Sequence, residues 1–531
     1  MFFFKVSNNS CHAVSGVINR FCNVSGQIVN LQKSFVKFSP NIFTEKQQEF
    51  KHMLSMPSTS NLGVYLGVPV DIQSSKVQHF TPVLDKVTKA ISSWNHLTIS
   101  QPAKLLIINT TLLGKILHYL SVFKIPATVC NKLDSLMAMF FWKDGYGKGI
   151  HWKKRSVLHR PKKLGGLGLR STTILNDTLL MKKAWRIKQH PQILLSKIFP
   201  YSRLSHHPQR LGKRHLSWGH KGLLNAEALL QQRYYWKVGN GCDIGVIAHK
   251  WIPGHTPLFR DSINLREVRD LRVAQLILPN NQGWKNRKIS SLFEPSTARY
   301  IKSIELLFST TERDYRYWPP TKSGEYSVKS GYDLLLHKQH DMCSMTSTID
   351  LALFRDLWGL RIMPKWKLFI WKLWHNGIAT TSNLTQRGVN NSTDSPICLN
   401  DHEDVHHLFR ACPLALEAWE QSGLRGDPQG SFHLGFSNWL SDWIVHYVKE
   451  DGARDSNSNL AKFIGVLWTI WVLRNGQVFR NNRPTSTSIA VQLQASAQQH
   501  LLFLQSGRDP TRNPLDPHNH QVLRWSTRAA R

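Results

Sequence analysis

Residues 394 to 419 read DSPICLNDHEDVHHLFRACPLALEAW, and this stretch predicts a small metal-binding module resting on a helix. Thiolate sulfur and imidazole nitrogen are the ligands that tetrahedral Zn²⁺ takes in proteins. A proline follows the last Cys, and the apolar run that comes next is typical of a helix opening at Pro. The two Cys and three His that lie close enough in sequence to surround one ion are Cys398, His402, His406, His407 and Cys412.

The same stretch lacks one expected ligand. A strong zinc signal contains a pair of Cys separated by two residues. Here Ser395 stands where the first Cys of such a pair would be, three positions before Cys398. The sequence therefore offers three good ligands, whereas a closed tetrahedral site needs four.

The composition favours a folded, basic protein with a polyanionic partner. The chain has 531 residues, enough for several domains, and its 19 Trp and 24 Phe indicate packed cores rather than disorder. Against 34 Asp and Glu it carries 68 Lys and Arg, which gives a net charge of +34. Such an excess is typical of proteins that bind nucleic acid, because neutralised phosphates release condensed counterions. A solvated basic surface is the alternative.

The positive charge is concentrated in one part of the chain. Between Gln101 and Lys250 the sequence has 26 Lys and Arg but only 5 Asp and Glu. The densest basic run follows Trp152 and precedes a Gly-rich bend at 165–169, and we predict that it contacts phosphates. Its members are Lys153, Lys154, Arg155, Arg160, Lys162 and Lys163.

Cysteine usage and hydropathy predict an intracellular protein, nuclear or cytoplasmic. Seven scattered Cys, an odd number, do not form a disulfide framework. The first residues do not have the order of a secretory signal. The apolar run at 463–473 is about half as long as a bilayer requires, so we expect no membrane span.

Hydrophobic periodicity predicts a mainly α protein with small β elements, built from several domains, with the knuckle-like metal module set on helices. The expected β pieces are a hairpin over 234–251, turning at Gly239-Asn240-Gly241, and a strand over 324–328. A loop or linker is expected over 194–224 and a polar, frayed tail from 506. Helices are expected over 77–94, 103–123, 126–142, 172–189, 301–307, 328–335, 364–374, 380–387, 460–479 and 489–504.

Short motifs follow one another in a fixed order along the chain, and their series resembles a known family. It is similar to the downstream half of the reverse transcriptase polyprotein of plant LINE-type (non-LTR) retrotransposons. The resemblance covers about 21–479, and residues 326–419 resemble that family's reverse-transcriptase zinc-binding domain. The motifs are YLGVP (65–69), FW (141–142), IHW (150–152), GGLGL (165–169), WKVGNG (236–241), YSVKSGY (326–332), NLTQRG (383–388) and EDVHHLFRAC (403–412).

The resemblance implies five parts. They are the end of a polymerase palm (1–75), a basic helical thumb-like or connecting region (76–190), a linker with a small β-containing region (191–320), the zinc-binding-like domain (321–424), and C-terminal helices with a tail (425–531).

The resemblance also implies which residues hold zinc. Cys398, His407 and Cys412 fall on three of the family's ligand positions, and Ser395 falls on the first Cys. A serine hydroxyl is a poor ligand for Zn²⁺ at neutral pH. The fourth position is therefore left to His402, to His406, to Ser395 itself or to water.

The amino-terminal residues resemble the polymerase segment just after its catalytic Asp-Asp pair, so no catalytic residue is assigned. Nucleotidyl transfer needs carboxylates that hold two divalent ions, and the family's ribonuclease H domain is not recognisable either. We expect a non-catalytic fragment that binds RNA or DNA. The alternatives are the trailing part of an RNA-directed DNA polymerase whose catalytic portion is encoded upstream, and a domesticated structural or interaction protein.

Overall fold

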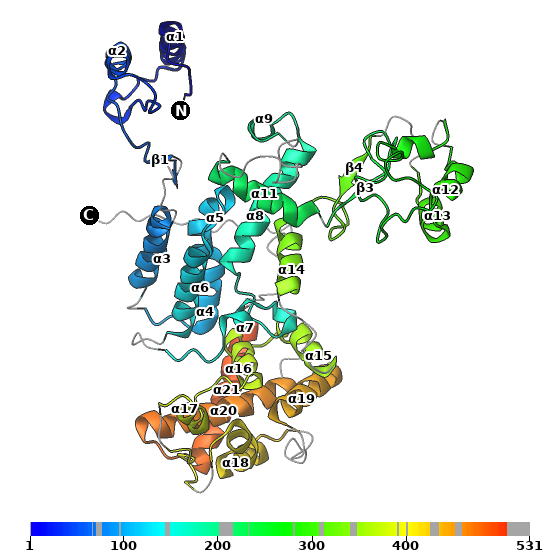
Figure 1. The fold of residues 1–531 in the computed structure, drawn as a ribbon. Helices are drawn as coiled ribbons and strands as arrows, with labels where there is room; N and C mark the ends of the chain where they lie inside the picture. Colours follow the sequence, from blue (N-terminus) through cyan, green and yellow to red (C-terminus); the bar gives the residue numbers. More distant parts are fainter. Residues whose placement is uncertain are drawn as a thin grey trace. The chain divides into compact units, whose positions relative to one another are not determined.

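The computed structural model describes residues 2–65, 67–70, 77–94, 97–143, 149–200, 216–231, 233–279, 282–306, 313–339, 348–389, 392–399, 402–424, 435–451 and 459–506. It divides the chain into two compact units, Met1–Asp85 and Lys86–Arg531. Most of the described elements are helices, and the strands are two or three residues long (Figure 1). The predicted class, mainly α with small β elements, is confirmed. The finer division into five parts stays a prediction.

The first unit is a small helical element with one short pair of strands. Helices α1 and α2 pack against each other, and β1 pairs with β2 in antiparallel register. Helix α1 starts after Ser7, whose hydroxyl accepts the backbone N–H of Ser10, and ends at Gly26 in the left-handed conformation. The elements are α1 (Asn8–Ser25), η1 (Leu31–Lys33), α2 (Thr44–Leu54), β1 (Val64–Tyr65), β2 (Val68–Pro69) and η2 (Gln78–Phe80).

The second unit begins with a bundle built around helix α8. Helices α5, α6, α11 and α14 all pack against α8 (Figure 1). The buried Asn176 on α8 fixes the turn between α5 and α6: its amide donates to the carbonyls of Leu120 and Phe123 and accepts the N–H of Ile125. Helix α3 (Thr81–Ser93) crosses the boundary between the two units. The other helices are α4 (Gln101–Ile107), the π-helical turn η3 (Ile108–Leu112), α5 (Leu113–Val122), α6 (Ala127–Trp142), α8 (Thr172–Gln189), α11 (Trp218–Gln231) and α14 (Val328–Gln339).

The helices predicted for this bundle are confirmed. Pro102 and Pro126 lie at the starts of α4 and α6, where the missing proline N–H costs no hydrogen bond. One difference is the π-helical turn between α4 and α5, which interrupts a helix predicted as regular. The predicted linker over 194–224 is wrong in part, because α9 (Leu194–Ile198) and the start of α11 lie within it. Residues 201–215 of that linker lie outside the described part.

One helical stretch in the described residues, Gln101–Val122, is long and apolar enough to cross a membrane by length and composition. This is weak evidence for a span, since a core helix of a soluble protein passes the same test. Part of the stretch packs against α6, α8 and α16, as a core helix would.

The hairpin predicted over 234–251 is wrong. Strand β3 (Tyr235–Lys237) pairs instead with β4 (Tyr315–Tyr317), in antiparallel register. The chain after β3 returns close enough for the N–H of Trp236 to donate to the carbonyl of Lys250 at 2.7 Å, but it forms no second strand. The N–H groups of the Gly-rich turn bind the buried carboxylate of Asp314 instead. Gly241 has a φ of 72°, and a Cβ there would lie 2.4 Å from the backbone N of Ala274. This turn therefore needs glycine for its conformation and for its close packing.

Two smaller expectations fail in the same region. The predicted strand over 324–328 is not formed: Gly324 closes a tight loop by accepting the backbone N–H of Trp318, residues 325–327 are irregular, and Val328 begins α14. The helix predicted over 301–307 is α13 (Pro295–Lys302), which opens at Pro295 and has ended by Ser303. Proline favours the first turn of a helix, so it sets this start earlier than hydrophobic spacing suggests. The remaining elements here are η5 (Val273–Leu276) and α12 (Asn286–Leu292).

Replacing Asp314 by Asn tests whether the carboxylate holds this turn. One carboxylate oxygen accepts the N–H groups of Gly239 and Gly241, at 2.7 and 2.9 Å, and the other accepts that of Asp243 at 2.8 Å. An Asn side chain turns one acceptor into a donor, which leaves a buried N–H unpaired. We expect a loss of about 1–3 kcal/mol in the free energy of unfolding. Urea denaturation measures it, together with faster hydrogen exchange at the amides of the turn.

Asp261→Asn is the matched control for this substitution, because it removes a charge from an exposed Asp in the same region. If both variants unfold at the same urea concentration as the unmodified protein, the carboxylate does not hold the turn.

The C-terminal helices form the second part of this unit. Helix α20 packs against α16, α18, α19 and α21. Helices predicted over 364–374, 380–387, 460–479 and 489–504 are all present, and the predicted tail beyond 506 lies outside the described residues. The elements are α15 (Thr348–Leu357), α16 (Pro364–Trp374), α17 (Thr381–Thr385), the π-helical turn η8 (His407–Ala411), α18 (Pro413–Gln421), α19 (Phe436–Asp451), α20 (Asn459–Arg480) and α21 (Ser486–Gln505).

Candidate metal centre

The structure brings three of the predicted ligands together. Cys398 lies in the loop before η8, His407 is the first residue of η8, and Cys412 is the N-cap of α18. The ligand atoms of these three side chains all lie within 4.8 Å of one another. The loop before η8 therefore carries one thiol, the first residue of η8 carries the imidazole, and the start of α18 carries the second thiol. The three groups lie close enough together to bind one ion.

The distances fit Zn²⁺. Cys398 Sγ lies 3.4 Å from His407 Nε2. In a tetrahedral site, with Zn–S about 2.3 Å and Zn–N about 2.0–2.1 Å, a sulfur and a nitrogen lie about 3.5 Å apart. The donor set, two thiols and one imidazole, is also the chemistry that zinc selects over harder cations. These residues could hold Zn²⁺ with three protein ligands.

Burial shapes the chemistry of the ligands. Cys412 is fully buried and His407 is 8 % exposed. Desolvation by burial, strengthened by the neighbouring Cys398, raises the pKa of Cys412 to about 11. A bound cation has the opposite effect, because it stabilises the thiolate directly, so metal binding here releases protons.

The other candidate ligands have different contacts. Ser395 is fully buried, and its hydroxyl accepts the backbone N–H groups of Ile397 and Cys398, at 3.3 and 3.5 Å. His402 is exposed, and its Nδ1 contacts the Thr393 hydroxyl. His406 Nε2 lies 3.1 Å from Nη1 of Arg410. Ser395 is therefore built into the turn that carries Cys398, whereas both His side chains have partners on the protein.

A buried ion pair, which the sequence did not predict, supports the loop between the ligands. The guanidinium of Arg474 on α20 donates to both carboxylate oxygens of Glu403, at 3.0 and 2.5 Å. Both side chains are at most 2 % exposed. Glu403 also accepts the N–H of Thr381, and Asp404 accepts the N–H of His407 at 2.7 Å. Arg474 thus fixes a backbone segment that ends at a metal ligand.

Some side chains of the predicted basic run contact other residues of the protein, and others are exposed to solvent. Arg155 donates to the carbonyl of Asn131 at 2.8 Å, and Lys162 Nζ lies 4.8 Å above the Trp358 ring. Arg160 is half-buried beside the Gly-rich bend. Lys154 and Lys163 are exposed, and within the described residues their ammonium groups have no protein acceptor. Lys153 is half-buried, and burial followed by the nearby Arg387 lowers its pKa.

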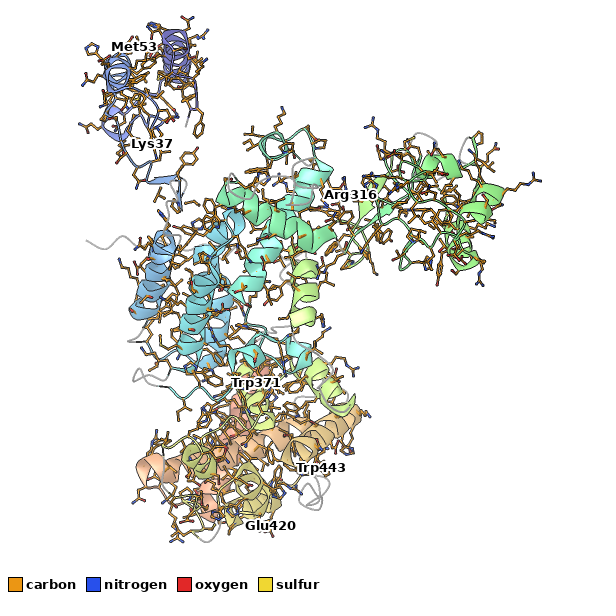
Figure 2. The ribbon with its side chains drawn as sticks, viewed as in Figure 1. Lys37, Met53, Arg316, Trp371, Glu420 and Trp443 are labelled. Atoms are coloured by element: carbon orange, nitrogen blue, oxygen red, sulfur yellow. The ribbon has the colours of Figure 1, made fainter. Side chains whose placement is uncertain are left out.

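The basic run is fixed to the domain that carries the metal ligands. The carbonyl of Gly165, in the bend after the run, accepts hydrogen bonds from Trp371 Nε1 at 2.9 Å and His375 Nε2 at 2.6 Å. Trp371 lies on α16 (Figure 2). Burial lowers the pKa of His375 to about 4, so the imidazole is neutral when it donates this bond. The basic run and the metal-binding segment therefore belong to one connected structure.

Comparison with known proteins agrees with these features. Residues 326–419 match the family described as zinc-binding in reverse transcriptase. An Arabidopsis thaliana protein named "Putative ribonuclease H protein At1g65750" is 25% identical over 409 residues, which are 76% of this chain and 64% of that protein. The chain thus spans less than two thirds of this relative.

A second relative, the "Uncharacterized mitochondrial protein AtMg00310" of the same organism, is 30% identical over 148 residues. The similarity covers 27% of this chain and 94% of that protein. Together with the zinc-binding match and the ligand geometry, these relatives show that the chain belongs to the plant retrotransposon proteins related to reverse transcriptase.

Proposed function

We propose that this chain binds RNA or DNA by its phosphate backbone, as a nucleic-acid-holding part of a LINE-type (non-LTR) retrotransposon reverse transcriptase. The observation that carries the proposal is that the basic run contains solvent-exposed ammonium groups. Lys154 and Lys163 are exposed, and the run they belong to is fixed to α16 through Gly165. A backbone segment held in place presents its charges at no further cost in backbone ordering, which favours a phosphate-binding surface.

The charge of the whole chain supports the same partner. A net charge of +34 repels other cationic surfaces and attracts polyanions over several ångströms. Phosphate contacts of this kind position a nucleic acid but do not read its sequence. We therefore expect similar affinities for RNA and DNA of unrelated sequence.

We assign no catalytic step to this chain. The polymerases that the chain resembles have an adjacent pair of catalytic Asp residues, and the 531 residues contain no Asp-Asp dipeptide. In this proposal the chain holds template or product, while a polymerase active site acts on it.

Replacing the two exposed lysines of the basic run tests the proposal. With Lys154→Gln and Lys163→Gln combined, we expect weaker binding to a 20-base-pair DNA duplex. The slope of log affinity against log salt concentration should become shallower by about 0.9 for each lysine that neutralises a phosphate. Fluorescence anisotropy over a series of salt concentrations measures both quantities.

The matched control removes two exposed lysines outside the basic run, Lys288→Gln and Lys322→Gln. It has the same net charge as the test variant. If the control lowers the slope as much as the test variant does, the long-range charge of the protein, rather than the basic run, holds the nucleic acid. Absence of any binding at low salt would refute the proposed function itself.

A further inference from the structure

A cavity of about 290 Å³ opens between helices α16 and α20, near the start of α4. This volume is near the lower end of the range of roughly 300–1,000 Å³ for small-molecule sites. Four aromatic side chains line its wall, and two lysines supply its positive charge. The lining residues that matter here are Trp152, Phe369, Trp468, Trp471, Lys365 and Lys372.

Lys372 differs from the other two lysines of α16. Lys367 is buried and donates to the carbonyl of Trp358 at 2.8 Å. Lys365 donates to the amide oxygen of Gln499 at 2.8 Å and lies 5.1 Å above the Trp468 ring. Lys372 lines the cavity, and no acceptor for its ammonium is found among the described residues. Burial lowers its pKa to about 8, as expected for an ammonium without a compensating anion.

The cavity adjoins the basic run. Trp152 lines it and directly precedes Lys153. The Arg387 guanidinium lies 5.1 Å from the Trp152 ring and donates to the carbonyls of His151 and Trp152. Gly377, another lining residue, lies so close to Lys153 that a Cβ there would be 3.9 Å from Lys153 Cε. Two further cations therefore lie beside the cavity, on the side of the basic run.

We propose that this cavity takes one unpaired nucleotide of a bound single strand, with its base against the indole rings and its phosphate at Lys372. This inference rests on the proposed function, because the basic run would hold the neighbouring phosphates of the same strand. Every base has a π-face that stacks on aromatic side chains, so such a site tolerates any sequence. An apolar ligand would leave the ammonium uncompensated, and a free phosphate would leave the indole wall without a partner.

Two variants of the full chain test the cavity separately from the basic run. Lys372→Met removes the charge and keeps the length of the side chain, and Ala379→Phe fills the cavity, which Ala379 lines. For a 12-nucleotide single strand, we expect Ala379→Phe to bind about 5- to 150-fold more weakly, the range that corresponds to the loss of one stacked base. We expect Lys372→Met to bind the same strand more weakly as well, because it loses a phosphate contact. Binding to a blunt 12-base-pair duplex should not change. Fluorescence anisotropy measures both affinities.

Lys462→Met is the matched control, since it removes an exposed charge from α20 outside the cavity. If both cavity variants and this control weaken single-strand binding equally, or if none of them does, the cavity proposal is overturned.

Adenosine monophosphate separates the cavity from the proposed function. We expect it to quench tryptophan fluorescence in the unmodified protein but not in Ala379→Phe. Quenching without any binding of oligonucleotides would refute the proposed function and leave the cavity site standing. If oligonucleotides bind, adenosine monophosphate does not quench the fluorescence and Lys372→Met has no effect, the cavity site is refuted and the proposed function stands.

Discussion

Replacing Ser395 by Cys is expected to raise the affinity for Zn²⁺ by at least about 100-fold. Loss of a group that merely orients a metal ligand already costs about 10–100-fold in affinity, so a complete additional ligand should count for no less. The substitution turns a site with three protein ligands into a closed site with four, the arrangement typical of structural zinc.

The backbone around Ser395 is already shaped for this ligand. The serine hydroxyl accepts the N–H groups of Ile397 and Cys398, and its carbonyl accepts that of Leu399 at 3.0 Å. Leu399 has a φ of 62°, a left-handed conformation that closes the turn. A sulfur at the position of the hydroxyl would accept the same two N–H groups, which lower the pKa of a thiol by favouring its thiolate. The turn that carries Cys398 therefore already provides the two N–H groups that would stabilise a thiolate at residue 395.

Competition with a chromophoric zinc chelator measures the affinity, and the charge-transfer absorption of Co²⁺ in place of zinc reports how many thiolates bind. We expect two thiolates in the unmodified protein and three in Ser395→Cys. Ser323→Cys adds a thiol at an exposed position outside the ligand group and serves as the control. Equal zinc affinity in Ser395→Cys and the control would show that residue 395 does not face the metal.

The sequence predicted the helices of this protein better than its strands, for a physical reason. A helix satisfies its own backbone and shows its buried face at a fixed spacing, so α8 could be delimited from residues 172–189 alone. Strand β3 needs a partner from elsewhere in the chain, and β4 follows it by about eighty residues. The turn residues after β3 pointed to a hairpin, because nothing local shows that Asp314 would bind their N–H groups.

The candidate site was predictable only as far as its residues are neighbours in sequence. Cys398, His407 and Cys412 lie within fifteen positions, and the ion that they suggest restricts how they can fold. The cavity at Lys372 was not predictable, because its wall comes from α16, α20 and the segment at Trp152. In the sequence, Lys372 is one of several lysines in an amphipathic helix, and only the absence of an acceptor in the described structure distinguishes it.

Breaking the buried pair between Glu403 and Arg474 is expected to destabilise the second unit by about 3–5 kcal/mol, because the remaining charge stays buried without compensation. Glu403→Gln keeps the size of the side chain and leaves Arg474, which is 2 % exposed, without its counter-ion. Arg474→Met leaves the carboxylate with one donor among the described residues, the N–H of Thr381. Urea denaturation of the zinc-loaded protein measures each loss. As a control, Glu417→Gln removes a less buried carboxylate from α18.

The double variant Glu403→Met, Arg474→Met decides what the pair contributes. Two apolar side chains of similar length cost no desolvation, so the stability of the double variant should be closer to that of the unmodified protein than the stability of either single variant is.

The zinc affinity of the double variant should not recover in the same way. Backbone bonds tie Glu403 to Thr393 and Ser382, and the next residue, Asp404, holds the N–H of His407. If the charges position this loop, the double variant regains stability but still binds zinc about 10–100-fold more weakly. If stability and zinc affinity both recover, the two side chains contribute only packing. If neither recovers, the single variants lost packing rather than the charge interaction.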